Sequence, residues 1–346
     1  MSFMLDEIRE QPDVIGRLVD AEQDSATHLA AEIERRAIDF VVMAARGTSD
    51  HAAVYGKYLL EIRNSIPVAL ADPSVFTLYD AKLKMDRALV IGISQSGQAT
   101  DVAEYLDRCK RAGALTAAIT NVAGSTLTQT AHHTIFCHAG QEKGVAATKT
   151  YTSTLAALYL LSASLSHDVR HAKEQLLSCA DAMRTALGME DYIAKRAERY
   201  RFIQDGYVVS RGFNYCTALE TALKLAETCY VSVLAYSAAD FLHGPIAAVL
   251  EGEACFLIAP PGRAFATMAD MALRLTDRKA DIAVISSEDE ILRRATIPFR
   301  IEVRIEEDLS PLVYVIPGQF LAHFLALSRG LDPDRPRGLS KVTLTR

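Results

Sequence analysis

The feature that most constrains the fold is an internal repeat, because the second half of the 346-residue chain echoes the first. Three pairs of segments correspond: 39–61 with 206–227, 88–97 with 254–263, and 114–120 with 280–286. Gly212 follows Gly47 by 165 residues, Gly262 follows Gly97 by 165, and the third pair of segments is offset by 166. A nearly constant offset over three segments predicts two copies of one domain.

Each copy alternates short apolar runs with helical patterns, which favours a parallel sheet covered by helices. The first copy has strand candidates at 40–45, 88–94, 115–120 and 133–139. We therefore predict an α/β protein with two tandem domains, each a doubly wound, flavodoxin-like parallel sheet flanked by helices. The predicted boundaries are 1–165 for the first domain with an N-terminal helical segment, 166–205 for a helical connector, and 206–346 for the second domain with a C-terminal tail.

Composition excludes several classes of protein. The net charge is −6 and no long basic run occurs, so the sequence has no electrostatic footprint for nucleic acid. The six cysteines are scattered without C-x-x-C spacing, which argues against a disulfide framework or a zinc site and fits a reducing cytoplasm. The N-terminus is too charged for a signal peptide, and the longest apolar segment, 154–165, is too short to span a bilayer. We expect a cytoplasmic protein that binds neither nucleic acid nor membrane.

A polar turn follows the apolar run LVIGI at 89–93, where Ser94, Gln95, Ser96 and Gly97 precede a helical pattern. A helix that begins at the carboxyl end of a parallel strand points free backbone N–H groups outward, which suits an anion. The segment RGTSD places Thr48 and Ser49 in an equivalent turn. Serine and threonine are also ordinary helix caps, and for either turn alone capping is the better interpretation.

Comparison with the second copy of the domain favours phosphate binding over helix capping. Ser94 and Ser96 correspond to Ala259 and Pro261, so the hydroxyls survive in the first copy alone. Two hydroxyl-rich turns in one copy, lost at the matching site of the other, favour a phosphate-binding site built without lysine.

Acid and base candidates lie in the second half. Glu220, Lys224 and Glu227 share one face of a predicted helix. Their spacing is most often a solvated ion-pair ladder, although it also suits proton transfer. His243 lies on a loop before Gly-Pro, where a histidine is structural or a general acid/base. Lys341 in the tail has the pattern of a surface lysine.

Six motifs in order now carry a resemblance: RGTS, SQSG, GVAATK, ALETALKLAE, HGP and LDPDRPRGLSKVT. The chain resembles the sugar isomerase (SIS) domain family over nearly its whole length. Within that family it resembles the isomerase half of glutamine–fructose-6-phosphate aminotransferases and the stand-alone glucosamine-6-phosphate deaminases.

The resemblance implies a role for each motif. Glu227 would move a proton between carbons 1 and 2 of a hexose phosphate, and Lys224 would support the site. His243 would assist ring opening, from the neighbouring subunit of a homodimer with composite active sites. Lys341 would form a Schiff base with the keto sugar. The phosphate would be held by Thr48, Ser49, Ser94, Gln95 and Ser96, and the sugar by Gly47, Val145 and Ala147. No cofactor and no metal is expected.

Departures from the aminotransferase pattern shape the expected reaction. Its CGTS is RGTS here, Ala99 replaces a phosphate-contacting threonine, and Ala147 replaces a sugar-contacting serine. The glutamate before HGP becomes Asp240, and no glutaminase segment with a terminal cysteine precedes the isomerase half. We therefore expect deamination of glucosamine 6-phosphate to fructose 6-phosphate and ammonia.

Four alternatives remain at this stage. Three are enzymes: an amination of fructose 6-phosphate that uses ammonia or a transaminase-like step, a fructosamine-6-phosphate deglycase, and a galactosamine-6-phosphate deaminase. The fourth is a phosphosugar-binding sensor without catalysis, since a fold does not fix a function.

Overall fold

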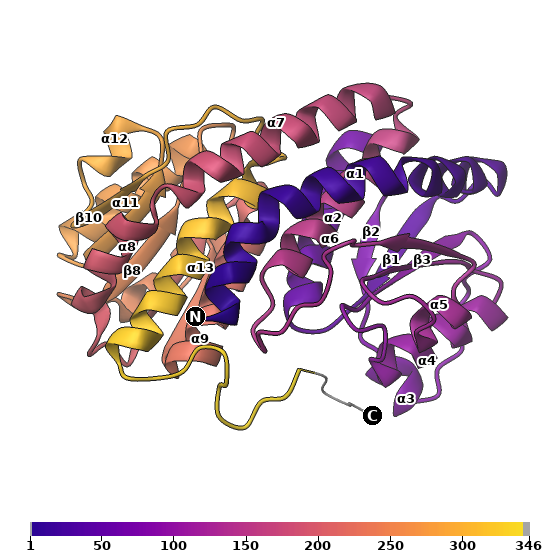
Figure 1. Cartoon of the computed structure of the whole chain (residues 1–346), viewed down its shortest axis with the longest axis horizontal. Helices are drawn as coiled ribbons and strands as arrows, with labels where there is room; N and C mark the ends of the chain where they lie inside the picture. Colours follow the sequence, from indigo (N-terminus) through magenta and orange to yellow (C-terminus); the bar gives the residue numbers. More distant parts are fainter. Residues whose placement is uncertain (1, 342–346) are drawn as a thin grey trace. The chain divides into compact units, whose positions relative to one another are not determined.

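The structure, a computed structural model, describes residues 2–341 of the chain. These residues divide into two compact units, and each holds one five-stranded parallel sheet (Figure 1). The first unit comprises residues 13–142, 149–178 and 339–341. The second comprises residues 2–12, 143–148 and 179–338. The domain boundaries expected from the sequence stay a prediction.

The sheet of the first unit has the strand order β2-β1-β3-β4-β5, and every pairing is parallel. This is the doubly wound order expected from the sequence. Its strands are β1 (Phe40–Ala44), β2 (Val68–Leu70), β3 (Ala88–Ile93), β4 (Leu115–Thr120) and β5 (His133–Phe136). Its helices are α2 (Thr48–Asn64), α3 (Ser74–Thr77), α4 (Thr100–Arg111), α5 (Thr126–Thr130) and α6 (Lys149–Leu165).

The sheet of the second unit has the order β10-β9-β8-β6-β7, which is the same topology repeated. Its strands are β6 (Asp205–Ser210), β7 (Ser232–Ser237), β8 (Ala254–Ile258), β9 (Asp281–Ser286) and β10 (Ile297–Arg300). Its longer helices are α8 (Glu190–Ala197), α9 (Tyr215–Cys229), α11 (Phe265–Asp277) and α13 (Ser310–Ser328), and its short ones are η1 (Glu198–Tyr200), η2 (Gly212–Asn214), α10 (Ala238–Leu242), η3 (Pro245–Ala248) and α12 (Asp289–Leu292). Helices α1 (Phe3–Arg35) and α7 (Val169–Leu187) contribute residues to both units.

The tandem α/β architecture predicted from the repeat is confirmed. Three of the four edge strands, β2, β7 and β10, were not predicted, whereas the fourth, β5, was. Strands β2 and β7 are partly exposed, and β10 contains Pro298. Such strands lack the continuous apolar run of a central strand, whereas β3 and β4 are buried at every residue.

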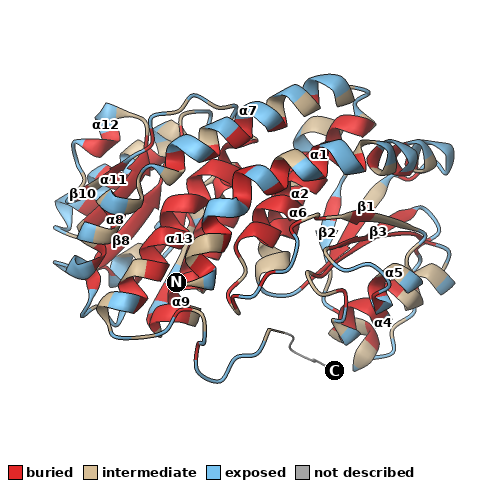
Figure 2. Cartoon of the chain, viewed as in Figure 1, coloured by how far each residue is buried: buried red, intermediate tan, exposed pale blue. Residues whose placement is uncertain are grey.

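One helix in each unit is buried almost all round, namely α6 in the first and α13 in the second (Figure 2). The prediction that 154–165, within α6, is the longest apolar segment is wrong, because α13 is longer and apolar. By length and composition α13 could cross a membrane, but 89% of it is buried. It packs against α9, where a Cβ at Gly318 would lie 2.4 Å from Oγ1 of Thr221. Close packing in the core thus explains why α13 is so apolar.

His323 is a titratable group inside α13, with a relative exposure of 1%. Its Nδ1 has no hydrogen-bond partner among residues 2–341, and its ring packs edge-on against Phe324. Burial lowers the pKa of His323 below its ordinary value of 6.5, because the charged imidazolium is poorly solvated there.

We predict that His323 makes folding less stable in acid. Below about pH 6.5 the unfolded chain binds a proton at this residue that the folded chain does not, so the unfolding free energy falls as pH falls, by at most about 1.4 kcal/mol per pH unit. Urea unfolding from pH 5 to 8 should show that the stability of wild type relative to His323→Leu decreases below pH 6.5. A difference that stays constant over this range would contradict the assignment.

Candidate functional site

The predicted phosphate-binding residues come from two turns that lie at the same edge of the first sheet. Strands β1 and β3 are neighbours and parallel, with Val41 opposite Leu89. The chain leaves β1 toward β2 on one side and β3 toward β4 on the other. Ligands of doubly wound sheets bind at such a reversal, beyond the carboxyl ends of the strands. The turns 46–49 and 94–99 both begin there.

The turn after β3 is closed by a backbone hydrogen bond and packs so closely against Ser125 that residue 97 has to be glycine. The N–H of Gly97 donates to the carbonyl oxygen of Ser94 at 3.1 Å. Gly97 has φ +63°, and a Cβ there would lie 2.1 Å from Oγ of Ser125. Ser94 is buried, while Gln95 and Ser96 are partly exposed.

Helices α2 and α4 begin without a capping side chain. Their N-cap residues, Gly47 and Ala99, carry no side-chain oxygen. The N–H groups of Ser49 and Asp50 in α2 donate to the carbonyl oxygens of Arg46 at 3.1 Å and Gly47 at 2.9 Å. In α4 the N–H of Val102 donates to Oδ1 of Asp101 at 2.9 Å. In addition, the positive end of each helix dipole is directed at the same edge of the sheet. The two helix starts together make a site suited to an anion, here called the β1–β3 cradle (residues 46–49 and 94–99).

The second copy provides an internal comparison. At its matching turn, the carboxylate of Glu307 accepts hydrogen bonds from the N–H groups of Arg263 at 2.9 Å and Ala264 at 3.2 Å. A Cβ at Gly262 would lie 2.4 Å from that carboxyl carbon. An anion of the chain itself therefore occupies the start of α11, the helix that corresponds to α4. This turn geometry suits a negative group, and sequence offset alone did not indicate Glu307.

A cation also lies at the β1–β3 cradle. Nε of Arg46 donates to Oδ2 of Asp101 at 2.8 Å, and Asp101 has a side-chain exposure of only 2%. Burial raises the pKa of Asp50 in the first turn of α2, although the charges of His51 and Arg46 oppose this shift. Arginine at position 46 is a departure from the CGTS motif to which the sequence alone assigns no role.

The acid–base candidates on α9 form a buried cluster in the second unit. Nζ of Lys224 lies 3.3 Å from Oε1 of Glu220 and 2.5 Å from Oε2 of Glu227. The side chains of Lys224 and Glu220 are fully buried, and that of Glu227 is 23% exposed. The interpretation as a solvated ion-pair ladder is therefore wrong, because two of the three side chains are inside the core.

The buried charge of Lys224 is stabilised by its two carboxylate neighbours. Burial alone would lower the pKa of Lys224, but the charges and hydrogen bonds of Glu220 and Glu227 outweigh burial and raise it. Lys224 therefore stays an ammonium ion. Of the two carboxylates, Glu227 is the one that solvent reaches, so it is the one placed to exchange a proton with a ligand.

The remaining predicted residues lie elsewhere in their units. His243 is exposed just after α10, and no hydrogen bond or ion pair among the described residues joins it to the α9 cluster. Val145 and Ala147 are partly buried in the loop before α6. Lys341 is not an ordinary surface lysine, because its Nζ lies 2.8 Å from Oε2 of Glu142.

Glu142 is a residue that the sequence analysis missed. Its side chain is fully buried and accepts hydrogen bonds from the N–H of Thr150 at 3.2 Å and from its hydroxyl at 2.7 Å. A carboxylate beside the GVAATK motif was the available signal, but a glutamate in a loop is usually solvated.

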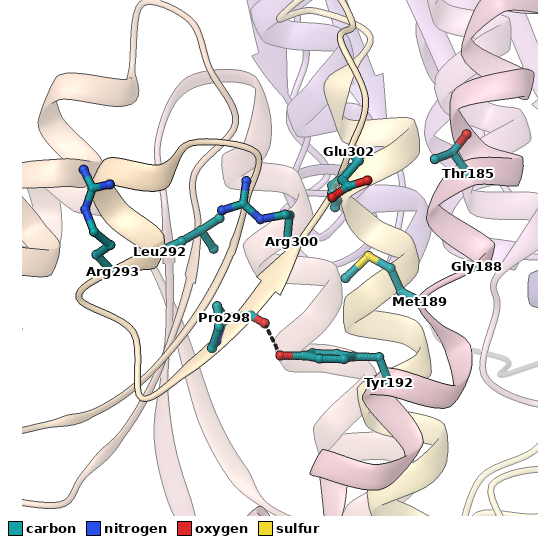
Figure 3. A pocket seen from close by; sticks show the side chains of 10 residues that line it. Thr185, Gly188, Met189, Tyr192, Leu292, Arg293, Pro298, Arg300 and Glu302 are labelled. Carbon is teal, nitrogen blue, oxygen red and sulfur yellow. Dashed lines mark hydrogen bonds between the residues drawn. The ribbon is translucent and has the colours of Figure 1, made fainter.

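Other features do not coincide with these residues. A cavity of about 590 Å³ lies between the α7–α8 junction and β10 in the second unit, and Tyr192 and Pro298 in its wall are hydrogen bonded (Figure 3). None of the predicted site residues lines it. The described residues contain no group of three metal-ligating side chains.

Comparison with known proteins gives a consistent picture. The SIS domain family model matches residues 38–164 and 206–329. A glutamine–fructose-6-phosphate aminotransferase (isomerizing) from Methanothermobacter thermautotrophicus is 37% identical over 341 residues, which cover 98% of this chain. The match spans 57% of that relative, so this chain corresponds to little more than half its length.

Solved structures agree. A protein from Silicibacter pomeroyi DSS-3, named as a candidate phosphosugar isomerase, is 33% identical with a TM-score of 0.84, covering 96% of this chain and 100% of its own. The C-terminal domain of a glucosamine–fructose-6-phosphate aminotransferase from Francisella tularensis is 25% identical with a TM-score of 0.86, covering 97% and 98% respectively.

The buried α9 cluster predicts a large effect on stability. Glu220→Gln leaves Lys224 with one fewer buried counter-charge, and breaking such a pair typically costs about 3–5 kcal/mol. The matched control is Glu251→Gln, which breaks the exposed pair of Glu251 with Lys279 and should cost less than about 1 kcal/mol. Chemical denaturation measures both. Similar small losses for the two variants would contradict the burial of the cluster.

Proposed function

Because the chain belongs to the SIS domain family, we propose that it is an enzyme that acts on hexose 6-phosphates. Its proposed reaction converts glucosamine 6-phosphate and water into fructose 6-phosphate and ammonia. The observation that carries this proposal is the buried α9 cluster, in which an ammonium ion lies between a buried and a partly exposed carboxylate. A sensor of phosphosugars would need the β1–β3 cradle but not this costly charged cluster.

The 6-phosphate binds at the β1–β3 cradle. Thr48, Ser49, Ser94, Gln95 and Ser96 offer hydroxyl, amide and backbone N–H donors there, together with the positive ends of two helix dipoles. Anchoring the phosphate fixes the far end of the sugar, so the binding energy positions carbons 1 and 2 for reaction. Gly47, Val145 and Ala147 contact the sugar itself.

Proton transfer is the work of Glu227. After ring opening, assisted by His243, the sugar has an aldehyde at carbon 1 and an amino group at carbon 2. Glu227 removes the proton from carbon 2, and an enolamine forms as oxygen 1 gains a proton. Glu227 then returns a proton to carbon 1, which leaves an iminium at carbon 2. Lys224 holds the carboxylate in place through the 2.5 Å contact.

Release of ammonia completes the reaction. Water adds to the iminium carbon, ammonia leaves, and the ketone of fructose 6-phosphate remains. The Lys341 amine offers a covalent route, in which it displaces ammonia to form a Schiff base that water then hydrolyses. The chemistry needs no cofactor. We further propose that the protein works in the cytoplasm as a homodimer in which His243 serves the neighbouring subunit's site.

A second candidate is the reverse reaction, amination of fructose 6-phosphate. The names of the curated relatives favour it, since they are aminotransferases. The departures at Arg46 and Asp240 favour deamination, because the segments RGTSDHA and ADFLHGP resemble the stand-alone deaminases. The same residues would serve both directions.

The proposed function predicts ammonia release from glucosamine 6-phosphate by the purified protein. A glutamate dehydrogenase-coupled assay with a panel of 6-phosphosugars, including galactosamine and fructosamine derivatives, identifies the substrate. Incubating fructose 6-phosphate with ammonium, or with glutamine, tests the amination. If no member of the panel reacts in either direction while fructose 6-phosphate still binds, the protein is a sensor and the enzyme proposal fails.

Glu227→Gln is the sharpest variant for the mechanism. General acid–base groups typically contribute about 10²- to 10⁴-fold in rate, so kcat should fall by this range while fructose 6-phosphate binds nearly as before. Glu251→Gln is the surface control and should leave kcat unchanged. Loss of binding in parallel with kcat would mean that Glu227 holds the sugar rather than moving its proton.

A further inference from the structure

We propose that Arg46 is a phosphate-binding residue, whose guanidinium is held by Asp101 between the first turns of α2 and α4 and donates to the 6-phosphate. This inference rests on the proposed function, because it concerns the same β1–β3 cradle. It adds a full positive charge to a site that otherwise consists of hydroxyls and backbone N–H groups.

Geometry places this side chain at the cradle. Arg46 lies two residues beyond the end of β1, and Asp101 is the second residue of α4, the helix that follows β3. The 2.8 Å contact between Nε of Arg46 and Oδ2 of Asp101 therefore joins the turn after β1 to the first turn of α4. Since β1 and β3 are hydrogen-bonded neighbours, the guanidinium lies where both helices begin.

The terminal guanidinium nitrogens of Arg46 are available to donate hydrogen bonds to a ligand. Nε is the one guanidinium nitrogen of Arg46 that is hydrogen bonded within residues 2–341, and the side chain is 48% exposed. The two terminal nitrogens thus remain for a ligand. A guanidinium offers paired N–H donors in a plane, which matches two phosphate oxygens at once.

Asp101 in turn is fixed on both sides. Its Oδ2 accepts from Arg46, and its Oδ1 accepts from the N–H of Val102 at 2.9 Å. With a side-chain exposure of 2%, it cannot swing into solvent, so the arginine that it holds is oriented before any ligand arrives. A pre-oriented donor loses less side-chain entropy on binding.

Charge makes Arg46 more than an extra donor. Asp50 and Asp101 place carboxylates in the first turns of α2 and α4, at the site where a doubly charged phosphate would arrive. Arg46 offsets the charge of Asp101 directly. At the same time Ala99, the N-cap of α4, supplies no hydroxyl. An arginine at position 46 compensates for the negative charge of these carboxylates and for the missing hydroxyl at Ala99, and so restores attraction for the phosphate.

Two roles must be separated: contact with the phosphate, and neutralisation of Asp101. We expect Arg46→Gln to weaken fructose 6-phosphate binding about 10- to 100-fold in calorimetry, the range for a hydrogen bond to a charged group. The affinity for inorganic phosphate should weaken in parallel. Raising the salt concentration should weaken binding less in the variant than in the wild type. KM should rise more than kcat falls. Arg46→Lys keeps the charge without the planar fork and should recover part of the affinity.

Arg87→Gln is the matched control. Arg87 pairs with Asp39 at the opposite ends of β1 and β3, so its loss removes an exposed arginine from the same two strands without touching the cradle. It should leave the affinity for phosphate unchanged.

The deciding measurement repeats Arg46→Gln in an Asp101→Asn background. If Arg46 contacts phosphate, the Arg46→Gln substitution weakens phosphate binding in both backgrounds. If the loss disappears once Asp101 is neutral, or if Arg46→Gln binds like the wild type, the proposal is overturned. The probe with inorganic phosphate gives this answer even if no 6-phosphosugar is turned over, so failure of the proposed reaction and failure of this inference are distinguishable.

Discussion

The pairing of β1 with β3 is the constraint on which the rest of the first unit depends. Because the connections leave these two neighbours in opposite directions, α2 and α4 start side by side at one edge of the sheet. The backbone then provides N–H groups and helix dipoles before any side chain is chosen. In the second copy the corresponding turn carries the chain's own Glu307, so duplication has produced one cradle that is filled and one that is suited to a ligand.

The second constraint is electrostatic. A lysine with no exposure is tolerated inside α9 because Glu220 and Glu227 lie against it, and their charges keep it an ammonium ion. Burying such charges lowers the free energy of unfolding, and hydrophobic residues of similar size in their place often leave a protein equally or more stable. Its presence is easier to explain by chemistry than by folding, which is why the proposed reaction is centred on Glu227.

The repeat, the doubly wound parallel class and the cradle turns could be predicted, because they follow from local patterns such as LVIGISQSG and from a nearly constant offset. Burial could not be predicted from spacing: Glu220 and Lys224 have the spacing of a surface ladder yet lie in the core under α13. Pairs distant in sequence were missed for the same reason. Arg46 with Asp101 and Glu142 with Lys341 are joined only by tertiary structure.

The most direct test of the central claim is a crystal structure of the protein with fructose 6-phosphate. The account predicts phosphate oxygens within hydrogen-bond distance of residues 47–49 and 94–97, and no phosphate at the turn 259–264, where Glu307 already lies. A phosphate bound at that turn, or in the cavity beside Tyr192 (Figure 3), would contradict it.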